Sequence, residues 1–97
     1  MTPRRAIVLR RRDTDPDYIE MLVDTHQLEV VYTAVADVEH PRLSAMIAAQ
    51  HATDHRAEVI VVPYLTGETV RGDTDWKRIA EICDVITADD VVTPIAP

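Results

Sequence analysis

Short apolar runs alternate along this chain with mixed polar segments, and the alternation is typical of an α/β domain. The runs are rich in Val, Ile, Leu and Ala, as in parallel strands that are buried on both faces. They cover residues 5–11, 28–36, 58–62, 85–87 and 91–92. Because helix-type segments separate the first three runs, we expect βαβ crossovers. The pattern predicts one three-layer domain over residues 1–97, with a mainly parallel sheet of four or five strands and helices on both faces.

Helix-start signals follow the first and second runs. Asp15 and Pro16 form a cap-and-first-turn pair, and they predict a helix that ends near Thr25. Pro41 predicts a second helix that ends near Asp54. The expected apolar stripes are Ile19, Leu22 and Val23 in the first helix, and Leu43, Met46, Ile47 and Gln50 in the second.

The segment from residue 63 to residue 75 predicts a long loop, because it holds both glycines of the chain and no clear period. Thr74 or Asp75 would cap a third helix after this loop. The apolar residues of that helix would be Trp76, Ile79, Ala80, Ile82 and Cys83.

Composition narrows the class of protein. The chain contains no Phe and only one Trp, so its core must be mainly aliphatic. No apolar run approaches the roughly 18 residues that span a bilayer, and no signal peptide is visible, so we expect a cytoplasmic protein without a membrane partner. Cys83 is the only cysteine, which excludes an internal disulfide and fits a reducing compartment. Its apolar neighbours favour a buried thiol.

Charge is distributed unevenly along the chain. The net charge is −7, yet five of the ten basic residues are arginines within residues 4–12. From Asp13 onward the balance is −12, which disfavours strong binding to nucleic acid. Two interpretations of the arginines stay open: they pair with the acidic body, or they form an anion site.

Three short motifs resemble the catalytic domain of serine recombinases, the resolvase and invertase family. The segment 6–15 reads Ala-Ile-x-x-x-Arg-x-x-Thr-Asp, the segment 40–43 is similar to the family's Arg-Pro-x-Leu, and Val59–Leu65 resembles its third strand. The resemblance covers roughly residues 5–92. It implies a resolvase-like fold, with Arg11 in the place of the family's first-loop arginine.

The chain departs from that family where the chemistry is carried out. Asp13 stands where the family has its serine nucleophile, and Thr66 and Gly67 stand where it has an Asp-Arg pair. A carboxylate repels phosphate, and recombination needs a hydroxyl with several guanidinium groups. We therefore expect no enzyme activity. Asp13 is expected to accept hydrogen bonds from Arg11, Arg12 or the first helix.

Ligand binding in such a sheet is expected at the carboxyl ends of the strands. The candidate ligand-binding residues are Arg11, Arg12, Asp13, His40, Tyr64 and Arg71, with Asp37 and Thr66 on the same rim. No glycine-rich loop follows the first strand, so we expect no dinucleotide and no other cofactor. His51 and His55 have metal-ligand spacing, but a solvated helix face is the simpler interpretation, and we expect no metal.

The sequence thus predicts a non-catalytic, resolvase-like protein that acts through protein contacts, with a protein partner or a second copy of itself. The alternative is a small-ligand or phosphate-binding module, or an unrecognised hydrolase, that uses the loop after the first strand. A bound anion at that loop would favour the alternative, whereas a large apolar surface patch would favour the interaction role.

Overall fold

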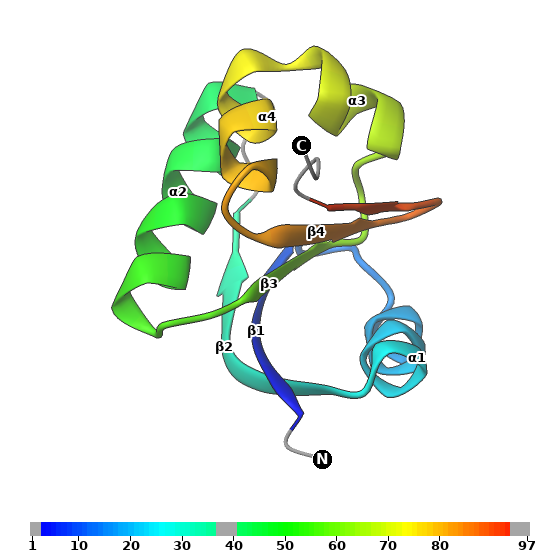
Figure 1. Ribbon diagram of the computed structural model, residues 1–97. Helices are drawn as coiled ribbons and strands as arrows, with labels where there is room; N and C mark the ends of the chain where they lie inside the picture. Colours follow the sequence, from blue (N-terminus) through cyan, green and yellow to red (C-terminus); the bar gives the residue numbers. More distant parts are fainter. Residues whose placement is uncertain (1–2, 37–40, 94–97) are drawn as a thin grey trace.

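The computed structural model describes residues 3–36 and 41–93, and these form an α/β domain around one five-stranded sheet (Figure 1). The strands are β1 (Arg4–Arg10), β2 (Leu28–Val35), β3 (Val59–Val62), β4 (Asp84–Thr87) and β5 (Val91–Val92). The helices are α1 (Pro16–His26), α2 (Pro41–Asp54), α3 (Gly67–Gly72) and α4 (Thr74–Ala80).

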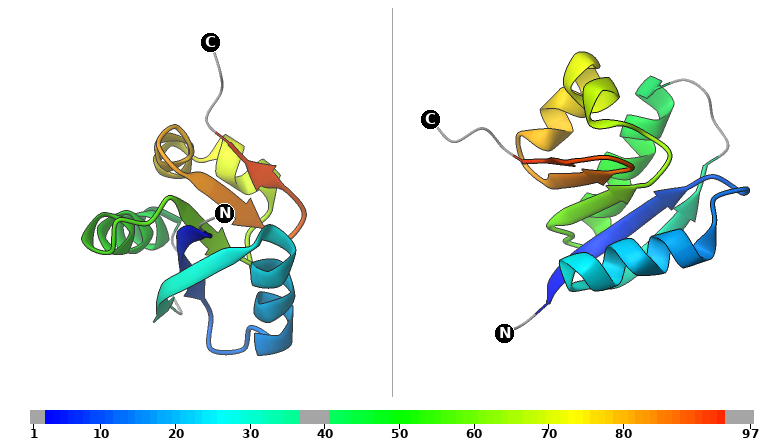
Figure 2. Two further views of the ribbon diagram at one scale, coloured as in Figure 1. Left: turned by 60° about the horizontal axis from the view of Figure 1, so that its bottom comes forward. Right: turned by 90° about the vertical axis from the view of Figure 1, so that its right-hand side faces the viewer.

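The strand order is β2-β1-β3-β4-β5, and all neighbouring pairs are parallel except β4 with β5. Figure 2 shows α1 on one face of the sheet and the other three helices on the opposite face. The predicted three-layer architecture with a mainly parallel sheet is therefore confirmed. The order reverses direction between β1 and β3, which makes the carboxyl ends of these two strands the switch point of the sheet.

The two central strands anchor the core. The side chains of Ala6–Leu9 in β1 and Val59–Val62 in β3 are almost completely buried. Alternate residues of these strands belong to two apolar clusters. One cluster lies beneath α1, and the other lies beneath α2, α3 and α4. A strand covered on both faces requires a continuous apolar run, and these runs made the two strands predictable from the sequence.

Helix α1 begins as the sequence predicts. The Asp15 side chain accepts a hydrogen bond from the backbone N–H of Asp17, and Pro16 occupies the first turn. Gln27 ends the helix in the left-handed conformation, with φ of 53°. The Tyr18 hydroxyl donates to the carbonyl of Ala88 at 2.7 Å, which ties α1 to the turn between β4 and β5.

The predicted apolar stripe of α2 is wrong. Leu43, Met46 and Gln50 are exposed, and Ile47 is only partly buried. The face that packs on the sheet is made of small residues, namely Ser44, Ala45, Ala48 and Ala52. Small side chains let a helix approach the sheet closely, and the position of the helix turns its large side chains outward. The outward face of α2 thus carries unpaired apolar surface.

The loop expected between residues 63 and 75 contains a helix, α3, capped by the Thr66 side chain. Gly67 and Gly72 are its first and last residues, so they are not isolated turn residues. The next helix, α4, is capped by Asp73 rather than by the two residues that follow it. Trp76 is fully buried under α4, whereas Ile82 lies beyond the helix and is 77 % exposed.

Strand β2 forms one edge of the sheet, and a β-bulge interrupts its pairing with β1. Ala6 faces Val30 but Ile7 faces Tyr32, so Val31 is the extra residue. The shift turns the Tyr32 ring toward α2, where it stacks on two imidazoles. Helix α1 packs beneath β1, β3 and β4, and the side chains of Val30 and Val35 are left exposed.

Candidate functional site

The switch point brings together the loop that follows β1, residues 11–15, and the loop that follows β3, residues 63–66. Ligands of open α/β sheets bind in the crevice at this place because the two loops diverge there. The predicted candidates Arg11, Arg12, Asp13 and Tyr64 lie on these loops.

Arg10 holds the first loop in a fixed conformation. Its guanidinium donates to the carbonyls of Arg11, Arg12 and Thr14, at distances of 3.1, 3.3 and 2.9 Å. The Thr14 hydroxyl in turn accepts a hydrogen bond from the backbone N–H of Arg11 at 3.0 Å. Arg10 thus holds the backbone of the loop that follows it, and the Thr14 hydroxyl is used as a structural hydrogen-bond acceptor.

Arg11 connects the two loops. Its guanidinium carbon lies 4.9 Å from the centroid of the Tyr64 ring, a cation–π contact between residues from the ends of β1 and β3. The Arg11 Nε is buried and has no hydrogen-bond partner within residues 3–36 and 41–93. Leaving a buried cationic donor unpaired costs free energy, so this N–H group is suited to donate a hydrogen bond to an anionic oxygen.

Asp13 does not fill the structural role expected from the sequence. It is exposed in the turn before α1, and in the described part of the chain no hydrogen bond involves its carboxylate. The cap of α1 is Asp15, two residues later, because the chain enters the helix only at Pro16. The carboxylate that occupies the nucleophile position of the resemblance is therefore not part of the helix cap.

The remaining candidates are dispersed. Arg12 is exposed, and Thr66 is used as the α3 cap. Arg71 forms an ion pair with Asp90 on the turn before β5, and it lines a cavity of about 400 Å³ between α3, α4 and β5. His40 and Asp37 lie outside the described residues. Of the six predicted site residues, the structure brings Arg11 and Tyr64 into contact.

The other arginines of the N-terminal cluster serve the fold. Arg4 forms an ion pair with Asp84 at the start of β4, and Arg5 donates to the carbonyl of His55 at 2.8 and 3.2 Å. Together with Arg10 they favour the interpretation in which most of the cluster pairs with the protein itself. Arg11 is the member with an unpaired buried donor in the described chain.

His51 and His55 both stack on Tyr32, with ring centroids 4.5 Å away in each case. Their own centroids are 6.2 Å apart. No group of three or more metal-ligating side chains occurs within the described ranges. The two imidazoles, spaced i and i+4, therefore attach α2 to the edge strand by stacking on Tyr32. The spacing alone did not predict this aromatic contact.

Cys83 is buried against the end of α4, and its Sγ lies 3.9 Å from the carbonyl oxygen of Ala57. Burial raises the pKa of the Cys83 thiol, and the neighbouring Asp84 carboxylate raises it further. A thiol with a raised pKa is a poor nucleophile near neutral pH. The position agrees with the buried thiol that the sequence favours.

Large exposed apolar side chains gather on β2 and α2. Among the described residues seven such side chains occur, and five of them belong to these two adjacent elements. Tyr32, Leu43 and Met46 lie on the α2 side of the sheet, and we call them the β2–α2 surface, whereas Val30 and Val35 face the α1 side. The other two, Met21 and Ile82, lie on α1 and after α4. The sequence did not reveal this surface, because the exposed side of α2 was expected to be its buried one.

No protein-family model matches the chain, and neither a curated protein nor a solved structure matches it. The resemblance to serine recombinases thus rests on the motif residues alone. Within the described segments, no helix has the length and apolar character needed to cross a bilayer.

Proposed function

We propose that this protein is a non-catalytic module that acts by binding another protein through the β2–α2 surface. The observation that supports the proposal is that Tyr32, Leu43 and Met46 are exposed on the same side of the sheet, on β2 and the neighbouring α2. Large apolar side chains that are exposed near one another are typical of protein-binding sites. Tyr32 and Met46 are also of the residue types that are enriched in such interfaces.

The local rigidity of the surface supports the same proposal. The stack of Tyr32 on His51 and His55 attaches α2 to the edge strand. Arg5 donates to the His55 carbonyl and holds the end of that helix near β1. A surface that is organised before binding loses little conformational entropy when a partner docks on it.

The chemistry of the first loop supports a non-catalytic role. Asp13 would repel a phosphate, and the Thr14 hydroxyl accepts a backbone hydrogen bond within its own loop. Phosphoryl transfer also needs several cationic groups around the reacting phosphate. In the described structure Arg4, Arg5 and Arg10 bond to the protein itself.

Site-specific photo-crosslinking tests the proposal. A photoreactive phenylalanine analogue replaces Met46 on α2 in one variant and Met21 on α1 in a matched control, since 59 % and 49 % of these side chains are exposed. After irradiation in extracts of the native cells, we expect a defined protein adduct at position 46, identified by mass spectrometry, and none at position 21. Equal labelling at both positions, or none at either, would contradict the proposal.

A second candidate function, binding of a small anion at Arg11 and Tyr64, is favoured by one observation. The Arg11 Nε is buried at the switch point without a hydrogen-bond partner in the described chain. A phosphate or carboxylate oxygen would satisfy this donor. This site is separate from the β2–α2 surface, so the two functions are compatible.

A further inference from the structure

A cavity of about 400 Å³ lies between α3, α4 and β5, at residues that the proposed function does not use. The buried part of its described lining is aliphatic and consists of Val70, Ala80 and Val92. Pockets of roughly 300–1,000 Å³ with mainly apolar walls and a few polar groups are typical of small-molecule sites. The cavity is thus large enough for a small organic ligand, and its apolar lining favours an aliphatic part in that ligand.

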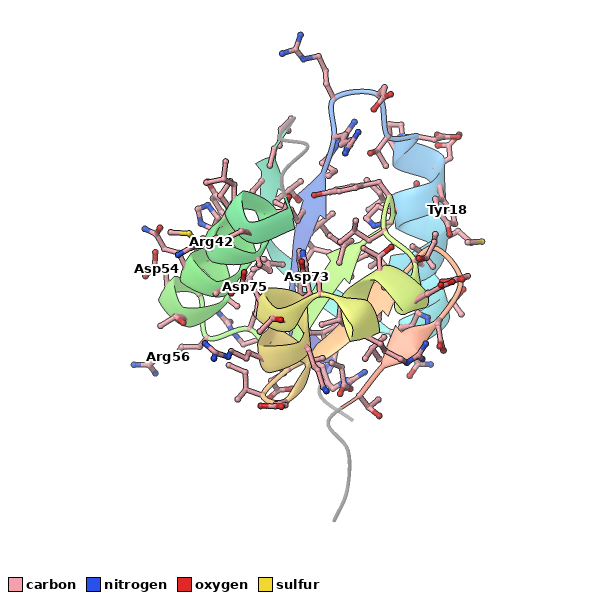
Figure 3. The ribbon with its side chains drawn as sticks, turned by 90° about the horizontal axis from the view of Figure 1, so that it is seen from above. Tyr18, Arg42, Asp54, Arg56, Asp73 and Asp75 are labelled. Atoms are coloured by element: carbon pink, nitrogen blue, oxygen red, sulfur yellow. The ribbon has the colours of Figure 1, made fainter. Side chains whose placement is uncertain are left out.

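The two helices beside the cavity are joined rigidly through Asp73. Its backbone N–H donates to the carbonyl of Thr69 at 3.0 Å, where α3 ends. Its carboxylate accepts hydrogen bonds from the backbone N–H groups of Asp75 and Trp76, both at 3.0 Å, where α4 begins. Figure 3 looks onto these helices and shows Asp73 where they meet. A cavity whose walls are fixed in advance loses little conformational entropy when a ligand binds.

The positive charge on the α3 side of the cavity is already neutralised. Arg71 lines the cavity and forms an ion pair with Asp90 on the turn before β5. The pair is packed against Gly67, where an added Cβ atom would lie 3.0 Å from a guanidinium nitrogen of Arg71 and 3.0 Å from the Cβ atom of Asp90. Glycine therefore permits this close approach. The charges of the described lining that remain to recognise a ligand are on α4.

Two opposite charges at α4 border the cavity and stand one helical turn apart. Lys77 and Glu81 both line the cavity, and both side chains are exposed. Within residues 3–36 and 41–93, neither of them forms an ion pair with the other or with a third group. Lysine placed before glutamate at this spacing is the weaker order for a helical pair. Both charges are therefore available to a ligand that enters the cavity.

We infer that this cavity binds a free α-amino acid with an aliphatic side chain. The carboxylate of such a ligand accepts hydrogen bonds from the Lys77 ammonium, and the ligand's own ammonium donates to the Glu81 carboxylate. Its side chain packs on the aliphatic lining formed by Val70, Ala80 and Val92. The inference is independent of the proposed function, because the cavity shares no described residue with the β2–α2 surface.

Charge complementarity selects this class of ligand over simpler ones. A plain carboxylic acid would pair with Lys77 but would bring its negative charge beside Glu81, and a plain amine would bring positive charge beside Lys77. A zwitterion carries both groups on one carbon atom, so it can bridge two side chains whose Cβ atoms are about 5–6 Å apart on a helix. The described lining contains no aromatic ring, so an aliphatic side chain fits it better than an aromatic one.

Titration with L-leucine, followed in the amide NMR spectra of the isotope-labelled chain, tests the inference. We expect saturable shifts at the amides of Val70, Ala80 and Val92. Three analogues each lack one recognised group: isocaproate lacks the ammonium, isopentylamine lacks the carboxylate, and glycine lacks the side chain. Each analogue should bind at least about fivefold more weakly than leucine. The absence of saturable shifts with leucine, or an analogue that binds as tightly as leucine, would overturn the inference.

Because Lys77 and Glu81 are exposed, their charges can be removed without disturbing the core. Lys77→Gln and Glu81→Gln should each weaken leucine binding by about fivefold. The matched controls are Arg78→Gln, next to Lys77 on α4 but outside the described lining, and Glu20→Gln on α1. Both controls should stay within about twofold of wild type. Equal affinities in the site variants and the control variants would overturn the inference.

Isocaproate binding to the same variants separates the roles of the two charges. Lys77→Gln should weaken the binding of isocaproate, because the partner of its carboxylate is lost. Glu81→Gln should strengthen it, because the repulsion between two carboxylates is removed. A loss of isocaproate affinity in Glu81→Gln would exclude Glu81 as the partner of the ligand ammonium and would overturn the inference.

Discussion

The Tyr32 ring on β2 stacks on the His51 imidazole on α2, with ring centroids 4.5 Å apart and planes inclined by 29°. This contact joins the edge strand of the sheet to a helix whose large side chains face solvent. It exists because a bulge at Val31 turns Tyr32 toward the helix. The contact therefore determines how Tyr32 lies beside the exposed apolar side chains of α2.

We predict that the stack contributes measurably to stability. Tyr32→Ala and His51→Ala should each lower the free energy of unfolding, and their double-mutant cycle should give a coupling of about 0.5–1.5 kcal/mol. Tyr32→Phe keeps the ring and should lose little. Urea denaturation at neutral pH measures the wild type, the two single alanine variants, the double variant and Tyr32→Phe. Additive single effects, with no coupling, would mean that the stack is incidental.

The two aspartates before α1 should differ in their effect on stability. Asp15→Ala removes the helix cap and should cost about 1 kcal/mol, which lowers the melting temperature by about 4–8 °C. Asp13→Ala changes an exposed residue and should stay within about 0.5 kcal/mol of wild type. Differential scanning calorimetry compares the two variants. A larger loss of stability in Asp13→Ala than in Asp15→Ala would show that Asp15 is not the residue that caps the helix.

Asp13→Ser should not create recombinase chemistry. The variant gains a hydroxyl, but Arg10 bonds to loop carbonyls and Arg11 lies over Tyr64, so we expect too few guanidinium groups around this hydroxyl for phosphoryl transfer. Incubation with supercoiled plasmid and a denaturing gel should show no covalent protein–DNA adduct for either the variant or the wild type. A reproducible adduct would contradict the non-catalytic interpretation.

Acid should weaken the link between α3 and β5. The hydrogen bond from Arg71, together with the backbone N–H of Val91, lowers the pKa of the Asp90 carboxyl below its usual value. A lowered folded pKa means that this stabilisation is present above the ordinary pKa and is lost as the pH falls through the folded value. NMR titration should place the Asp90 midpoint below that of a free aspartate, and Arg71→Ala should raise it. An unchanged midpoint in the variant would exclude Arg71 as the cause.

Inorganic phosphate tests the second candidate function. If it binds the Arg11 Nε, the melting temperature should rise with phosphate concentration, and Arg11→Gln should abolish the rise. Arg71→Gln is the matched control, because Arg71 already pairs with Asp90. Sodium chloride at equal ionic strength separates site binding from screening. A rise that persists in Arg11→Gln would place the anion elsewhere.

The sequence predicts the sheet well because its central strands are buried on both faces. The continuous runs at Ala6–Leu9 and Val59–Val62 have no competing interpretation, and the Asp15–Pro16 pair is a strong start signal for α1. These features depend on local chemistry, which the sequence contains directly. Of the candidate site, the same reasoning brought Arg11 and Tyr64 together, because both follow central parallel strands.

The orientation of α2 could not be predicted in the same way. A stripe of Leu43, Met46 and Ile47 is more apolar than one of Ser44, Ala45 and Ala48, so amphipathic analysis chooses the wrong side. Close packing against the sheet determines which side of α2 is buried, and this packing depends on how much space remains above the sheet. The bulge at Val31 is equally non-local, because it appears only in the pairing of β2 with β1. The β2–α2 surface follows from both features.

An affinity comparison tests whether the β2–α2 surface binds protein. The partner captured at position 46, whether a second copy or another protein, is titrated against wild type, Met46→Glu and Met21→Glu by isothermal titration calorimetry or sedimentation. We predict that Met46→Glu weakens binding by about tenfold or more, while Met21→Glu, an equivalent change on α1, stays within about twofold. Equal affinities for the two variants would contradict it.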